Sequence, residues 1–158
     1  MSNHPRRLKN GSVPNNLKTH KQALRKGQAP LASVHTMDSA EKISLIKNGV
    51  SKNDLQEIKD QTGLDYDTLS TILGVSRATL INKKGMEKFD SATSERILFL
   101  ADTITYGQSV FEDKDRFNAW MKNSNKSLGD KTPLELMDTV YGIQEVKKLI
   151  GRIEYGVF

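Results

Sequence analysis

Residues 67–84 have the sequence DTLSTILGVSRATLINKK, and this stretch decides the fold. Ser70 is a small residue four positions before Gly74, so two helices can cross closely there, and Gly74 permits a tight turn between them. Ser76 can cap a second helix through its hydroxyl, and Leu80 can pack that helix against the first. The spacing predicts a helix-turn-helix, a motif whose second helix fits the major groove of DNA.

Signals for helix starts and stops recur on both sides of this stretch. Asp38-Ser-Ala-Glu41 and Ser51-Lys-Asn-Asp54 both have the spacing of a capping box. Thr132-Pro133-Leu134-Glu135 adds a proline at the first helical position, where an N–H has no helical partner anyway. No alternation of apolar and polar residues is long enough for a strand, so the predicted fold class is all-α. The glycines at which we expect helices to end are Gly49, Gly63, Gly74, Gly85, Gly107 and Gly142.

Apolar residues at helical spacing mark the helix faces that we expect to be buried. The last helix shows this most clearly, because Ile143, Val146, Ile150 and Ile153 follow one another at intervals of three and four positions. The other residues expected to face inward are Ile43, Ile46, Leu55, Ile58, Leu80, Ile81, Ile97, Leu98, Ala101, Ile104 and Leu149.

The net charge of +5 conceals an uneven distribution. Residues 1–37 hold seven lysines and arginines and no acid, whereas residues 38–158 hold 17 basic and 19 acidic residues. The mixture of Pro, Gly, Asn, Ser and Lys in residues 1–37 predicts a mostly disordered, solvated tail. Two alternatives stay open: the tail is an arm that touches DNA phosphates, or translation begins at Met37.

Composition excludes several classes of function. The chain has no cysteine, which excludes disulfides and thiolate sites and fits the reducing cytoplasm. No run approaches the roughly 20 apolar residues that cross a membrane. All three histidines lie within residues 1–37, and the acidic run at residues 112–115 is better explained as a helix N-terminus than as a metal site. We therefore expect no catalytic site, no metal and no cofactor, and hence not an enzyme.

The second helix of the predicted motif would present its N-terminal residues to base edges. Arg77 can bind guanine and Asn82 can bind adenine through paired hydrogen bonds. Lys83 stands where the motif usually buries an aliphatic residue, but its stem can pack while its ammonium reaches out. A plain helical hairpin with solvated charges is the alternative. The predicted DNA-binding residues are Ser76, Arg77, Thr79, Asn82, Lys83 and Lys84, with Lys88 also near phosphates.

The C-terminal part of the chain carries a series of short motifs in a fixed order. This series resembles the toxin-binding domain of Xre/MbcA/ParS-type antitoxins, the partners of RES-domain toxins. Residues 43–101, including Leu73-Gly-Val-Ser76, resemble the Xre-like helix-turn-helix half of the same proteins. Ser124 and Asp130 depart from the pattern, in which Pro and a second Gly are frequent. The motifs are Phe117-Asn-Ala-Trp120, Asn125-Lys-Ser-Leu128-Gly129, Thr132-Pro133-Leu134-Glu135-Leu136, Asp138-Thr139, Gly142, Val146 and Gly151-Arg-Ile-Glu-Tyr-Gly-Val157.

The resemblance implies a cytoplasmic antitoxin in three parts: the tail 1–37, a helix-turn-helix domain 38–104 and a toxin-binding domain 105–158. It also implies a homodimer that joins a higher complex with its RES-domain toxin, occludes the toxin's NAD cleft with its C-terminal segment, and represses its own operon at an operator. Two other functions stay open. One is a stand-alone repressor whose C-terminal module dimerises, and the other is an interaction protein whose helix-turn-helix no longer binds DNA.

The resemblance places the last residues of the chain at or near the toxin cleft. An apolar end on a capped amphipathic helix also suits insertion into a pocket, because it is already ordered. The alternative is that Val157 and Phe158 dock on the chain's own helices. The predicted toxin-binding residues are Lys148, Arg152, Glu154, Tyr155, Gly156, Val157 and Phe158, whereas Trp120, Leu128, Leu136 and Val146 are expected to build the core of the module.

Overall fold

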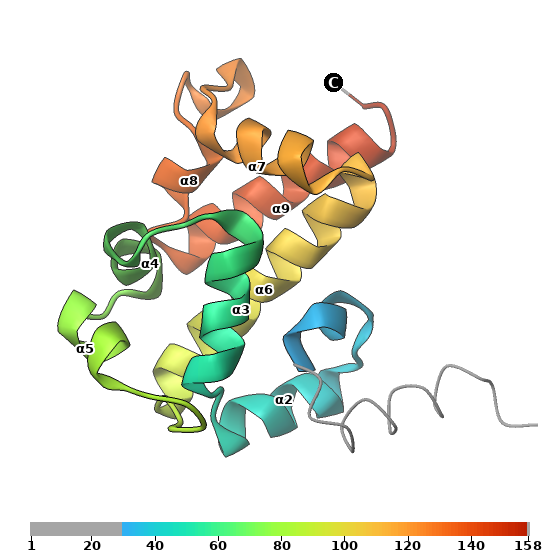
Figure 1. Ribbon diagram of the computed structural model, residues 1–158. Helices are drawn as coiled ribbons and strands as arrows, with labels where there is room; N and C mark the ends of the chain where they lie inside the picture. Colours follow the sequence, from blue (N-terminus) through green and yellow to red (C-terminus); the bar gives the residue numbers. More distant parts are fainter. Residues whose placement is uncertain (1–29, 158) are drawn as a thin grey trace, which may run out of the picture.

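The structure is a computed structural model that describes residues 30–157, which are helical between their loops (Figure 1). Within this range the only β-type pairings are two isolated antiparallel bridges, so the all-α prediction is confirmed. The predictions for residues 1–29 and for Phe158 lie outside the described residues. The elements are η1 (Pro30–Thr36), α2 (Ser39–Asn48), α3 (Lys52–Thr62), α4 (Tyr66–Leu73), α5 (Arg77–Asn82), α6 (Ser91–Phe111), α7 (Lys114–Lys122), η2 (Lys126–Leu128), α8 (Pro133–Leu136) and α9 (Val140–Glu154).

Several helices begin at side-chain caps that the sequence predicts. Asp38, Ser51 and Thr132 each form a complete capping box, in which the cap and the acidic residue three positions later exchange hydrogen bonds with the backbone. These bonds satisfy N–H groups that have no partner inside the helix. At the starts of α4, α5, α6 and α9, the side chains of Asp65, Ser76, Asp90 and Thr139 each accept a hydrogen bond from a backbone N–H.

Two glycines that we predicted to end helices lie inside them instead. Gly107 lies within α6, and a Cβ at this position would be 2.0 Å from Cε2 of Phe117. Gly142 lies in the first turn of α9, where a Cβ would be 1.6 Å from the carbonyl oxygen of Leu136. Both glycines therefore allow two chain segments to approach closely. The helix that begins at Pro133 accordingly ends at Leu136, and Thr139 caps a new one.

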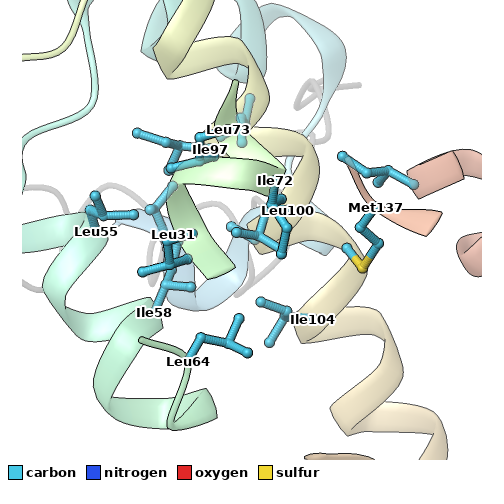
Figure 2. Close-up of a cluster of buried hydrophobic side chains, with 14 of the residues drawn as sticks. Leu31, Leu55, Ile58, Leu64, Ile72, Leu73, Ile97, Leu100, Ile104 and Met137 are labelled. Carbon is cyan, nitrogen blue, oxygen red and sulfur yellow. The ribbon is translucent and has the colours of Figure 1, made fainter. Parts of the chain in front are cut away.

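The long helix α6 is the centre of the fold. It contacts η1, α2, α4, α7 and α9, and Figure 1 shows α9 running beside it. Its buried side chains Ile97, Leu100 and Ile104 belong to one apolar cluster with residues of η1, α3 and α4 (Figure 2). Burial of such side chains is the main favourable contribution to folding. The domain boundary expected between residues 104 and 105 falls inside α6, so the division into 38–104 and 105–158 stays a prediction.

The prediction of a disordered tail is wrong for residues 30–37. η1 packs on α6, and Leu31, Val34 and Met37 are buried. The apolar residues of so short a 3-10 helix show no sustained period, and the surface that covers them lies on a helix far along the chain. Local sequence therefore carries little signal for this element.

Two isoleucines that we expected to face inward are exposed. Ile43 of α2 faces solvent because that helix packs on the core through Leu45 and Ile46, neither of which is fully buried. Ile81 is exposed because the six-residue helix α5 buries only Leu80.

Candidate functional site

The turn between α4 and α5 has the geometry of a helix-turn-helix. Gly74 has a left-handed φ of 65° and ends α4. The N–H of Val75 donates to the carbonyl of Ser70 at 3.2 Å, which closes the turn. The hydroxyl of Ser76 then accepts from the N–H of Thr79 at 3.1 Å and starts α5. The predicted turn at Gly74, cap at Ser76 and burial of Leu80 agree with the structure, whereas α5 ends at Asn82, before the stop predicted at Gly85.

A side chain of α6 covers this turn. Nη1 of Arg96 donates to the carbonyl of Ile72 at 3.3 Å. A Cβ at Gly74 would be 2.6 Å from the same nitrogen, so a larger residue would displace the end of the Arg96 side chain, and the positive φ of Gly74 favours glycine in any case.

The predicted DNA-binding residues lie in α5, at its N-cap and in the two residues after it. Arg77 makes an ion pair with α4, because its Nε lies 3.2 Å from Oδ1 of Asp67, and both side chains face solvent. The side chain of Lys83 is half-buried, and its Nζ lies 5.5 Å from the centroid of the Phe89 ring. Its stem therefore packs, as the sequence suggested. The exposed members of the predicted set are Ser76, Arg77, Thr79, Asn82 and Lys84.

Helix α9 has one buried face and one solvent face. Tyr141, Glu145, Lys148, Arg152 and Tyr155 follow one another at alternating intervals of four and three, which places them on one side of the helix. The side chains of Tyr141 and Tyr155 are 76% and 77% exposed, which is unusual for two large aromatic residues. The opposite face buries Ile143, Val146, Leu149 and Ile150, as predicted.

The solvent face of α9 contains one ion pair. Nζ of Lys148 lies 2.6 Å from Oε1 of Glu145, and this hydrogen bond and the charge of Glu145 raise the pKa of Lys148. Sequence reasoning selected Lys148, Arg152 and Tyr155 but missed Tyr141. A single tyrosine gives no signal until the register of the helix is known.

The C-terminal end of α9 is closed by two backbone hydrogen bonds. Gly156 has a φ of 63°, and its N–H donates to the carbonyl of Ile153 at 3.2 Å. The N–H of Val157 donates to the carbonyl of Arg152 at 2.8 Å. This pair of bonds is a Schellman cap, and it fixes the direction in which the chain leaves the helix. Val157 is 58% exposed, so it faces solvent for the most part.

Glu154, another predicted toxin-binding residue, is bound to α6. The hydroxyl of Tyr106 donates to its Oε2. Burial, this hydrogen bond and the charge of Glu154 raise the pKa of Tyr106 to about 12, so the phenol remains a donor at neutral pH. Glu154 thus ties the end of α9 to α6, and its contact with a toxin stays a prediction.

Asp102 of α6 connects elements from the two ends of the chain. Its Oδ1 lies 2.9 Å from Nδ1 of His35 in η1, and its Oδ2 lies 2.6 Å from Nζ of Lys147 in α9 and 3.6 Å from Nζ of Lys42 in α2. The ring of His35 also stacks on Tyr106, with 4.4 Å between centroids. Burial pushes the pKa of Asp102 up, but the hydrogen bonds from Lys147 and His35 and the lysine charges outweigh it, so this pKa lies below its usual range.

Residues 30–157 contain no group of His, Asp and Glu side chains that could hold a metal ion. Among these same residues, no helix is long and apolar enough to cross a membrane.

Comparison with known families agrees with this architecture. Residues 41–102 match the antitoxin Xre-like helix-turn-helix domain, and residues 107–156 match the antitoxin Xre/MbcA/ParS C-terminal toxin-binding domain. The first match contains α3, α4 and α5, and the second contains the end of α6 together with α7, α8 and α9.

Three relatives are antitoxins by name. A Prs ADP-ribosylating antitoxin of Sphingobium sp. (strain YBL2) is 28% identical over 151 residues, which cover 87% of this chain and 94% of the relative. The antitoxin Xre of Photorhabdus laumondii is 28% identical over 116 residues, covering 72% of this chain and 78% of the relative. The antitoxin Xre of Yersinia enterocolitica is 29% identical over 118 residues, covering 73% of this chain and 80% of the relative.

The fold and these matches define a type II antitoxin, a non-enzymatic protein that binds its toxin through a C-terminal domain and carries a helix-turn-helix domain for DNA. The chain belongs to the Xre/MbcA/ParS antitoxin family, as the sequence motifs indicated.

Proposed function

We propose that this antitoxin neutralises a RES-domain toxin that acts on NAD, and that its C-terminal segment occludes the toxin's NAD cleft. The name of the Sphingobium relative supports an NAD-directed partner, because NAD is the donor in ADP-ribosylation. The observation that carries the proposal is the Schellman cap at Gly156, which holds the exposed Val157 in a fixed direction beyond α9. A segment that is already ordered loses less conformational entropy on binding than a free tail does.

The toxin-contacting surface in this proposal is the solvent face of α9 together with the residues that follow it. Tyr141 and Tyr155 offer large, rigid contact areas, which is why tyrosine is common among residues that dominate binding energy. Lys148 and Arg152 supply positive charge toward a cleft that binds the phosphates of NAD. The full proposed set is Tyr141, Lys148, Arg152, Glu154, Tyr155, Gly156, Val157 and Phe158.

Removal of Val157 and Phe158 tests occlusion separately from binding. The shortened protein loses the bond from Val157 to Arg152 but keeps Tyr141, Lys148 and Arg152 on the face of α9, so we expect it still to co-purify with the toxin. NAD consumption by the toxin, measured with saturating antitoxin, should however return. A matched control is Met86→Ala, which removes another exposed apolar side chain outside this surface. Full inhibition by the shortened protein would show that the cleft is not closed by this segment.

We further propose that the antitoxin represses its own operon as a homodimer, with α5 in the major groove of each half-site. The exposed Arg77 and Asn82 would contact guanine and adenine, while Lys84 would contact phosphate. The helix carries few basic residues, so a single module would bind weakly. Two modules on a two-fold operator solve this problem.

Variants of α5 distinguish these roles. Arg77→Ala and Asn82→Ala should each weaken binding to the DNA upstream of the gene by about 1–3 kcal/mol and relax the preference at one base pair. Lys84→Ala should weaken binding to all sequences alike and reduce the salt dependence by about one counterion. If the three variants kept the parent's affinity and salt dependence in a gel-shift titration, α5 would not be the recognition helix.

A further inference from the structure

Lys52, the first residue of α3, is only 8% exposed. Its Nζ donates to the hydroxyl of Tyr66 in α4 at 2.8 Å and to the carbonyl of Leu80 in α5 at 2.5 Å. The same nitrogen lies 4.3 Å from the centroid of the Tyr66 ring. A buried charge without partners is strongly unfavourable, and these contacts provide partners for the ammonium of Lys52. One side chain thus joins α3, α4 and α5 of the helix-turn-helix domain.

The carbonyl of Leu80 needs this donor. In a continuous helix it would accept from the N–H of Lys84, four residues later. That N–H instead donates to Oε2 of Glu87 at 2.9 Å, because Lys83 is extended and α5 has ended. The ammonium of Lys52 therefore replaces a missing backbone partner near the C-terminus of α5, where the helix dipole also favours a cation.

The first turn of α3 also holds the loop that follows α5. The backbone N–H groups of Lys52 and Asn53 donate to the carbonyls of Glu87 and Gly85, both at 2.9 Å. These N–H groups belong to the set that has no partner within its own helix. Both the end of α5 and the loop after it are thus fixed to the same turn of α3.

The hydroxyl of Tyr66 is oriented to receive Lys52. It donates its proton to Oε1 of Gln56, one turn further along α3, at 2.8 Å. Its oxygen can therefore accept from Lys52. Each donor in this network of hydrogen bonds thus has an acceptor.

We propose that Lys52 is a positioning residue for DNA recognition. With six residues, α5 is far too short to be stable alone, so its angle to α3 and α4 depends on contacts such as this one. Lys52 holds the C-terminal end of α5 and thereby places Arg77 and Asn82 for contact with bases. This role rests on the proposed insertion of α5 into the major groove.

The test uses the full-length protein with Lys52→Met, which keeps the length of the side chain but cannot donate. We expect its affinity for the DNA upstream of the gene to fall about ten-fold or more, equivalent to about 1.4 kcal/mol. Lys122→Met is the matched control, because it removes an exposed positive charge at the end of α7, and it should keep the parent's affinity. Inhibition of the toxin by Lys52→Met should be unchanged.

Two further measurements separate positioning from other roles. The slope of affinity against salt should not change in Lys52→Met, whereas loss of a direct phosphate contact would reduce it by about 0.9. Amide hydrogen exchange should accelerate in residues 77–82 and stay unchanged in α9. If Lys52→Met does not fold, Tyr66→Phe removes the hydroxyl alone and should change exchange and affinity in the same direction.

The outcomes bear on two different claims. A folded Lys52→Met or Tyr66→Phe protein with the parent's affinity and the parent's exchange in α5 would overturn the positioning role. If the parent itself bound no upstream DNA, the proposed repressor function would fail, while exchange in α5 would still report whether Lys52 holds that helix.

Discussion

Replacement of Asp102 by Asn should lower the free energy of unfolding by about 2 kcal/mol. The carboxylate is 11% exposed and accepts charged or polar hydrogen bonds from Lys147 at 2.6 Å and from His35 at 2.9 Å. Hydrogen bonds to charged groups contribute about 1.5–3 kcal/mol each. The side chains of Lys147 and His35 are 37% and 36% exposed and regain water in the variant, so the expected loss is well below the sum of two such bonds.

Thermal unfolding followed by circular dichroism measures this change. A loss of about 2 kcal/mol corresponds to a decrease in Tm of roughly 4–8 °C for a protein of this size. Asp138→Asn, which alters an exposed carboxylate, is the control and should leave Tm unchanged. The double variant with Lys147→Met should lose less free energy of unfolding than the sum of the two single variants, because the two side chains share one hydrogen bond.

The pH dependence gives a second check on Asp102. Its pKa is lower in the folded protein than in the unfolded chain, so the folded state favours the charged form. The stabilisation is present above the unfolded pKa of about 3.9 and is lost as the pH falls through the folded value. The difference in the free energy of unfolding between the parent and Asp102→Asn should therefore shrink below about pH 4. Equal Tm values at pH 7 would refute the idea that Asp102 joins η1 and α9 to α6.

Three other substitutions have defined outcomes. Asp67→Asn should tighten DNA binding in a gel-shift titration, since it releases the guanidinium of Arg77 from an exposed ion pair and removes a negative charge beside the DNA. Thr132→Ala should lower the free energy of unfolding by about 1 kcal/mol in urea unfolding, because it removes the cap of α8. Thr132→Ser keeps a hydroxyl at the cap and should retain most of this stability. Gly107→Ala should cost about 1–3 kcal/mol in the same assay, since its Cβ would lie 2.0 Å from the ring of Phe117; a variant as stable as the parent would mean that α7 shifts without cost.

The sequence predicted those features of the fold that depend on neighbouring residues. The capping boxes at Asp38, Ser51 and Thr132 could be predicted because all their partners lie within three positions. Gly107 and Gly142 were misassigned because their role depends on contacts with separate segments, and a glycine that ends a helix looks the same in sequence as one that allows close packing.

The same distinction between local and long-range contacts applies to the candidate site. The predicted residues of α5 and α9 lie on two helices whose register follows from local periodicity. Lys52 and Asp102 could not be selected, because their partners come from elements that only the tertiary fold brings together. Tyr141 lies between these cases, since its exposure could be inferred only after the start of α9 at Val140 was known.

The continuity of α6 has a mechanical consequence. Its 21 residues form a strut about 30 Å long whose first turns support the DNA-binding half and whose last turns support the toxin-binding half. If α5 binds DNA and α9 binds the toxin, as proposed, this continuous helix holds the toxin at a set distance and angle from the base pairs under α5. The spacing of the proposed operator half-sites would then also set the spacing of the toxins above them, so the same DNA could either admit neighbouring toxin-bound antitoxins or force them apart.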